Sequence, residues 1–290
     1  MISELEVANL RRIGHARIRP DSFTVLVGAN GSGKTTLLRA IEECLTGRRS
    51  LPDHVCVVHA KGRKVRRSDV PSPELQPRPI RLVPNWTSLS APSQLSSGSA
   101  LLTPSCDNLA GAIGRLILDD PDAHQHINKD LEVIVPGARR VRARPTSGNV
   151  LELRVDYADV TDVPQEALST GTLLTIAILA AVHGEPRGKD GVVLMMDDID
   201  VGLHPGAQEK LVAALLQVAQ HDLVQIFTTT HSPYVVDAAG PENTWVLGPG
   251  KDGRSVAGRL SDHPDAAKAL QVLTAGEFWG SVGEEWLRTG

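Results

Sequence analysis

The amino-acid sequence predicts an α/β fold in which a mostly parallel β-sheet is covered by helices on both faces. Two segments that are apolar throughout, 192–196 and 224–229, alternate with helical patterns, as expected for buried strands of a parallel sheet. A third apolar segment, 23–27, runs through a glycine-rich loop into a helix. With 290 residues, 41% of them hydrophobic, the chain can bury the core of one large domain or two ordinary ones.

The first fifty residues predict a strand, a turn, a second strand, a loop and a helix. Residues 2–8 alternate between apolar and polar side chains, and residues 16–19 form a short segment before the apolar strand 23–27. Apolar residues then recur at helical spacing through 34–45, and Gly47 is placed to end that helix.

The composition changes between residues 68 and 105, where seven prolines and nine serines predict loop rather than packed structure. Two short helices are expected at 109–118 and 122–131, followed by alternating strands around Val141 and at 150–155. These elements look like a lobe inserted into the main sheet.

The α/β pattern then returns. A nearly apolar helix begins at Thr172, and an amphipathic helix around residues 211–218 lies between the two buried strands. Short strands at 245–247 and 256–260 are expected to extend the edge of the sheet, and a helical tail closes the chain.

Residues 28–35, GANGSGKT, match the pattern G-x-x-x-x-G-K-[ST] between a strand and a helix. Glycines let the backbone wrap phosphates, while consecutive N–H groups and the helix N-terminus supply positive potential. Lys34 can reach the β- and γ-phosphates, and Thr35 can coordinate Mg²⁺. A glycine-rich turn without a ligand is the alternative. The pattern predicts a site for ATP and Mg²⁺ formed by Gly28, Ala29, Asn30, Gly31, Ser32, Gly33, Lys34, Thr35 and Thr36.

Two carboxylates follow the apolar strand 192–196, at the strand end where ligands of open α/β sheets bind. Asp197 is expected to hold Mg²⁺. Adjacent residues at a strand end point in different directions, so Asp198 can address the attacking water. A helix cap or a turn is the alternative reading of such a pair.

Two further polar segments stand next to apolar elements. Ser169, Thr170 and Gly171 begin the helix that continues from Thr172, and they form a second anion-binding helix start. His231 follows the strand 224–229, which brings an imidazole to the same sheet edge as Asp197; an ordinary hydrogen-bonded histidine is the alternative.

Taken in order, GANGSGKT, LSTGT, LMMDDIDVGLHP and TTTHSP resemble the Walker A, signature, Walker B with D-loop, and switch-histidine motifs of ABC-type ATPases. The opening, with its NLRRI turn and FTVLVGANGSGKT, is more similar to the SMC, RecF and OLD-like branch of AAA family ATPases than to a transporter subunit. The resemblance covers residues 1–47 and about 165–240 well, residues 107–160 weakly, and the Pro/Ser segment hardly at all.

The resemblance implies a P-loop NTPase fold: an ABC-ATPase head with a mostly parallel core sheet, an antiparallel N-terminal β subdomain and an inserted helical signature lobe. It implies an ATP-sandwiched homodimer in which Ser169, Thr170 and Gly171 act in trans. It also implies that His231 senses the γ-phosphate and that Arg12 contacts the nucleotide.

This resemblance sets the expected domains. Residues 1–50 and 185–260 form a discontinuous nucleotide-binding core, and residues 51–106 form a basic, then Pro/Ser-rich, partly flexible insertion. Residues 107–184 form the signature lobe, and residues 261–290 form the C-terminal helical tail.

The sequence departs from the family pattern at two places. Asp198 stands where family members usually carry Glu, and displacing a catalytic group by an ångström can reduce a rate by about 10²-fold, so slow hydrolysis is expected. The Q-loop is not placed, because Gln76 and Gln94 both lie in the Pro/Ser-rich region without convincing context.

Basic residues gather in two stretches. Residues 48–67 hold seven basic side chains against one acid, and a second cluster spans residues 139–144. Both partly alternate, so a solvated strand face is as good an interpretation as contact with nucleic-acid phosphates. Aromatic residues make up only 3% of the chain and none is interleaved with these arginines, which disfavours single-strand stacking. The candidate DNA contacts are Arg63, Lys64, Arg66, Arg67, Arg140 and Arg142.

Composition also bears on location. The net charge of −4 argues against a general nucleic-acid coat. Cys44, Cys56 and Cys106 are too few and too scattered for a disulfide framework, which favours a reducing, cytoplasmic compartment. The N-terminus does not resemble a signal peptide, and the longest apolar run, 172–182, is far shorter than the ~20 residues of a bilayer crossing, so no membrane contact is expected.

The expected function is that of a Mg-dependent ATPase in DNA repair, DNA maintenance or anti-phage defence, acting with a separately encoded effector such as a nuclease. Two alternatives stay open. A nucleotide-dependent scaffold with negligible turnover fits Asp198, and a transporter energising subunit is disfavoured because LSTGT departs from the usual LSGGQ.

Overall fold

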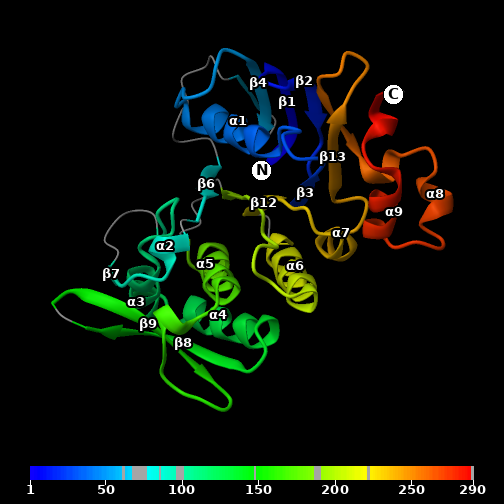
Figure 1. Ribbon diagram of the computed structural model, residues 1–290. Helices are drawn as coiled ribbons and strands as arrows, with labels where there is room; N and C mark the ends of the chain where they lie inside the picture. Colours follow the sequence, from blue (N-terminus) through cyan, green and yellow to red (C-terminus); the bar gives the residue numbers. More distant parts are fainter. Residues whose placement is uncertain are drawn as a thin grey trace. The chain divides into compact units, whose positions relative to one another are not determined.

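The computed structural model divides the chain into two compact units (Figure 1). The core unit comprises Met1–Arg81, Arg187–Asp200 and Leu215–Gly290, and the lobe unit comprises Leu82–Pro186 and Val201–Ala214. The residues that the structure describes are 1–60, 63–66, 77–84, 86–95, 101–146, 148–185, 191–220 and 223–288.

One large sheet organises the core unit. Its order, within the described residues, is β5-β4-β1-β2-β14-β13-β3-β12-β11-β6. The central strands β13, β3, β12 and β11 run parallel, whereas β5, β4, β1 and β2 pair antiparallel. The predicted fold class is therefore confirmed. The strands are β1 (Ile2–Leu10), β2 (Ile13–Ile18), β3 (Phe23–Val27), β4 (Val55–Ala60), β5 (Arg63–Arg66), β6 (Arg78–Leu82), β11 (Val192–Met196), β12 (Val224–Thr229), β13 (Thr244–Pro249) and β14 (Ser255–Arg259).

Helices bury their apolar sides on this sheet because its central strands are apolar on both faces. Leu37, Leu38 and Ile41 of α1 belong to a buried cluster that includes Met195 and Phe227 of the central strands. The helical elements of the core unit are α1 (Lys34–Thr46), α7 (Pro233–Ala239), η2 (Leu260–Asp262), α8 (Ala266–Ala269), α9 (Ala275–Val282) and η3 (Glu285–Arg288), and α6 (Pro205–Ala219) begins in the lobe unit and ends in the core unit.

The lobe unit packs helices against a small sheet in which β9 pairs with β10, β7 and β8. Gln165, only 1% exposed, holds the lobe together: its amide accepts from Leu153 N–H and donates to the carbonyls of Leu89 and Ala91. The elements are α2 (Trp86–Leu89), β7 (Ser93–Gln94), α3 (Leu109–Asp119), α4 (Pro121–Ile134), β8 (Ala138–Pro145), β9 (Val150–Tyr157), β10 (Val163–Pro164), η1 (Gln165–Ala167) and α5 (Thr170–Gly184).

The prediction of loop throughout residues 68–105 is wrong for β6, α2 and β7. Strand β6 forms at the edge of the large sheet, where Arg78 N–H donates to the carbonyl of Gly191. Pro79 has no N–H to donate, and an edge strand tolerates that. Tertiary pairing therefore overrides a loop-like composition.

Candidate nucleotide-binding site

The glycine-rich loop joins the end of β3 to the start of α1 in the core unit. Gly28 and Gly33 have φ angles of 140° and 106°, a region that side-chain-bearing residues rarely adopt. A Cβ on Gly28 would also overlap the carbonyl oxygen of Leu247 on β13. The loop's path therefore depends on glycine at the position where the phosphate-binding pattern places it.

Lys34 points back into this loop. Its side chain is 7% exposed, and Nζ donates to the carbonyls of Gly28 at 2.8 Å and Ala29 at 3.3 Å. Burial lowers the pKa of Lys34, and the carboxylates of Asp198, Glu284 and Asp197 partly offset that effect. A buried ammonium group thus stands inside a loop of backbone amides.

Thr35 connects the loop to the end of β11. Its hydroxyl donates to Asp197 Oδ1 at 3.0 Å. Burial raises the pKa of Asp197, and hydrogen bonds from Thr35 and Thr229 oppose that rise. Hydroxyl and carboxylate oxygens suit Mg²⁺, so this pair fits a cation that also contacts phosphate.

Thr229, at the end of β12, contacts both carboxylates, although it is not among the predicted site residues. Its hydroxyl oxygen is 3.1 Å from Asp197 Oδ1 and 3.3 Å from Asp198 Oδ1, and it accepts the backbone N–H of Asp198 at 2.8 Å. Asp198 has a left-handed φ of 49°. The hydroxyl-rich run that precedes His231 was the signal available in the sequence.

Two more predicted residues lie at the loop. The Arg12 guanidinium is 3.4 Å from the position that a Cβ on Gly31 would take. Ser32 Oγ is buried and has no hydrogen-bond partner among the described residues. An unpaired buried hydroxyl suits a phosphate oxygen, which supports the fit of a nucleotide. Asn30 is exposed and Thr36 is half-buried.

His231 and the signature-like segment belong to different units. His231 is exposed between β12 and α7 in the core unit. Ser169 caps α5 in the lobe unit, where its Oγ accepts Thr172 N–H at 3.1 Å. Ser169 and Thr170 are exposed, whereas Gly171 is buried and lies so close to Gly202 that a Cβ would overlap the Gly202 carbonyl.

The comparisons with known proteins agree with this geometry. The family described as "AAA domain, putative AbiEii toxin, Type IV TA system" matches residues 60–237, more than half of the chain. The chain belongs to this AAA domain family. A second family, described as "AAA ATPase domain", matches residues 1–66 of this AAA protein. Both families are ATPase domains, and the predicted family resemblance is confirmed.

Solved SMC head structures share the fold of this AAA protein. The SMC head bound to the C-winged helix domain of ScpA is 16% identical, has a TM-score of 0.58 and covers 93% of this chain and 99% of its own. A second structure is the Pyrococcus furiosus SMC head with an extended coiled coil, bound to the C-terminal domain of ScpA. It is 14% identical, has a TM-score of 0.56 and covers 93% of this chain and 98% of its own. The Thermotoga maritima SMC head domain is 16% identical with a TM-score of 0.51, covering 89% and 98%. No curated protein matches the chain in sequence. None of the helices described here is long and apolar enough to cross a membrane.

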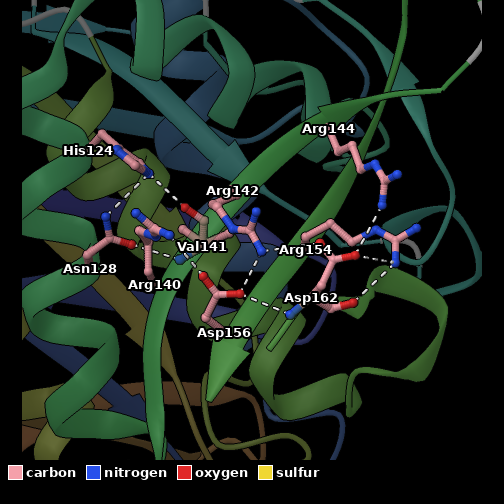
Figure 2. A network of polar contacts seen from close by, with 9 residues as sticks. All are labelled: His124, Asn128, Arg140, Val141, Arg142, Arg144, Arg154, Asp156 and Asp162. Atoms are coloured by element: carbon pink, nitrogen blue, oxygen red, sulfur yellow. Dashed lines mark hydrogen bonds and ion pairs between the residues drawn. The ribbon is translucent and has the colours of Figure 1, made fainter. Parts of the chain in front are cut away.

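The second basic cluster of the AAA protein is matched by acids on and after the neighbouring strand (Figure 2). Arg142 donates to Asp156 at 2.6 Å and Asp162 at 3.2 Å, while Arg140 donates to Asp156 and Arg144 to Asp162, both at 3.1 Å. Arg154 is 3.6 Å from Asp162. These arginines therefore connect β8 and β9 to the turn after β9. Such ion pairs within the lobe unit are a structural role, as an alternative to contact with DNA phosphates.

The remaining basic candidates lie on the edge strand β5. Lys64 and Arg66 are exposed there, and Arg63 begins the strand. Arg67 lies outside the described residues, as does Gln76, one of the two Q-loop candidates. Gln94, the other candidate, is exposed on β7 of the lobe unit.

Replacing Asp156 with Asn is expected to destabilise the lobe unit by about 1–2 kcal/mol at pH 7. Burial alone would raise the pKa of Asp156, but hydrogen bonds from Asp162 N–H, Arg142 and Arg140 lower it to about 2. Because the folded pKa lies below the unfolded one, this stabilisation is present above about pH 4 and is lost as the pH falls toward 2.

Urea unfolding of wild type and D156N at pH 7 and pH 3 tests this expectation. The difference between the two proteins should shrink at pH 3. The matched control is D159N, because Asp159 is exposed in the same turn. Equal unfolding midpoints for D156N and D159N at pH 7 would show that the arginine network contributes nothing.

Proposed function

We propose that this chain binds Mg-ATP at the glycine-rich loop and the carboxylates after β11, and that it hydrolyses ATP slowly. The observation that carries the proposal is the hydrogen bond of 3.0 Å between Thr35 and Asp197, which joins the end of the glycine-rich loop to the carboxylate after β11. Both oxygens would hold Mg²⁺, which when bound neutralises phosphate charge. Lys34 would hold the β- and γ-phosphates, and Asp198 would orient the attacking water.

We further propose that ATP closes a homodimer, with Ser169, Thr170 and Gly171 of one protomer against the nucleotide of the other. One nucleotide does not need two phosphate cradles on the same protomer. The capped, partly exposed N-terminus of α5 supports this proposal, because the first N–H groups of a helix have no intrahelical partner and favour an anion. His231 would then report the γ-phosphate to α7, which begins two residues later at Pro233.

Mixing two inactive variants tests action in trans. Lys34→Ala removes the phosphate ligand, and Ser169→Arg blocks the exposed signature, so each variant alone should lose ATPase activity. In an equal mixture about half of the dimers are mixed and hold one intact composite site, so about a quarter of wild-type activity should return. The control is each variant alone at the total protein concentration of the mixture. A mixture as inactive as its components would contradict the trans arrangement.

We propose duplex DNA as a partner, and with it a role in DNA repair, DNA maintenance or defence alongside a separately encoded effector. The exposed basic side chains Lys64 and Arg66 on an edge strand support this proposal. Phosphate contact is steeply salt-dependent. ATPase rates with and without duplex DNA at two salt concentrations test it, and equal rates with no DNA binding at low salt would exclude DNA.

A further inference from the structure

The end of the chain packs near the candidate site. Residues 274–288, called here the C-terminal segment, contain α9 and η3 (Figure 1, in red beside β13). Gly276 N–H donates to Asp237 of α7 at 2.6 Å, and η3 contacts β13 and β14. The segment therefore touches both the helix that follows His231 and the strand that lies beside the glycine-rich loop.

Glu284 lies at the loop end of β13. A Cβ on Gly248 would overlap the Cβ of Glu284, so the carboxylate-bearing residue rests directly on that strand. Gly248 follows Leu247, whose carbonyl oxygen lies against Gly28. Because β13 runs parallel to β3, the carboxyl ends of both strands lie on the same side of the sheet. Packing thus brings Glu284, from the far end of the chain, to the edge that carries Lys34.

The charge of Glu284 is not neutralised by its own neighbours. Within the described part of the chain its carboxylate makes no hydrogen bond or ion pair, and its side chain is half-buried. Lys34 Nζ donates to the carbonyl of Gly28 at 2.8 Å, and the Leu247 carbonyl, one residue before Gly248, lies against that same Gly28. Asp197 and Asp198 each lie within hydrogen-bonding distance of the Thr229 hydroxyl, whereas no threonine hydroxyl of the described residues bonds to Glu284.

We propose that Glu284 is an internal counter-charge to Lys34 that opposes nucleotide phosphate, so that ATP binding and the seating of the C-terminal segment disfavour each other. This inference rests on the proposed ATP site. The phosphates of ATP carry several negative charges to the place where Lys34 points, and a nearby carboxylate repels them. The coupling is reciprocal: a seated segment lowers ATP affinity, and bound ATP loosens the segment.

Binding of ATP, ADP and AMP to wild type, Glu284→Gln and Glu285→Gln tests the proposal. Glu285 is the matched control because it is the next residue, is 70% exposed and pairs with Arg288 rather than with the loop. Glu284→Gln keeps the side-chain size and should tighten ATP binding by about fivefold, with a smaller gain for ADP and little for AMP. Glu285→Gln should bind all three like wild type.

A purely structural role for Glu284 predicts equal changes for the three nucleotides, and that result overturns the proposal. ATP binding no tighter in Glu284→Gln than in Glu285→Gln also overturns it, while leaving the ATP site intact. Wild type that binds no ATP overturns the proposed function, and the counter-charge with it. As a second measurement, hydrogen exchange in residues 275–288 of wild type should rise when ATP is added, and unchanged exchange contradicts the coupling.

Discussion

Replacing Lys34 with alanine is expected to lower ATP affinity by about 100-fold, because it removes two or more charge-assisted hydrogen bonds to phosphate. The same change should leave the unfolding temperature unchanged or raise it. Burial lowers the pKa of Lys34, which means that the charged ammonium group is less well stabilised in the folded protein than in water. Loss of binding without loss of stability would separate a ligand-binding role from a structural one.

Calorimetric titration with Mg-ATP and thermal unfolding of the same samples measure both effects. Lys251→Ala is the matched control, because Lys251 is exposed in the β13–β14 turn of the same unit. Wild-type ATP affinity in Lys34→Ala would mean that the glycine-rich loop does not bind phosphate, and the proposed function would fail with it.

The fold could be predicted where local pattern and tertiary environment agree. Strands β3, β11 and β12 have the predicted bounds because strands buried on both faces are apolar throughout. Helix α1 ends where predicted, since Gly47 adopts a left-handed φ of 72°. Strands β4 and β6 were not predicted, because their backbone partners lie on β1 and at Gly191, which sequence spacing does not reveal.

The same distinction applies to the site. Gly28 and Lys34 belong to one short motif, so their proximity follows from the sequence. Thr229 reaches Asp198 only because β12 lies beside β11, and Glu284 comes to the loop end of β13 only through packing on Gly248. The acids that pair with Arg140 and Arg142 come from the paired strand and the turn after it. Counting charges along residues 139–144 therefore overstates the unpaired positive charge there, because these pairing acids lie further along the sequence.

Replacing Asp198 with alanine is expected to reduce the ATPase rate by about 10²-fold without weakening ATP binding, and Asp198→Glu is expected to raise the rate above wild type. The proposed base is one methylene shorter than the usual Glu, and its backbone is fixed by the Thr229 hydroxyl at 2.8 Å and a left-handed φ of 49°. A longer side chain extends the carboxylate toward the attacking water without moving this backbone.

Single-turnover hydrolysis with saturating ATP measures these rates apart from binding. Thr229→Val is the companion variant: it keeps the side-chain shape but removes the hydroxyl that holds the Asp198 backbone, so it should give a smaller loss than Asp198→Ala. A rate unaffected by Asp198→Ala would show that another group orients the water. A third outcome is that wild type shows no measurable turnover while Asp198→Glu is active. That result would favour the nucleotide-dependent scaffold, because the short side chain of Asp198 would then keep the ATP-bound dimer closed.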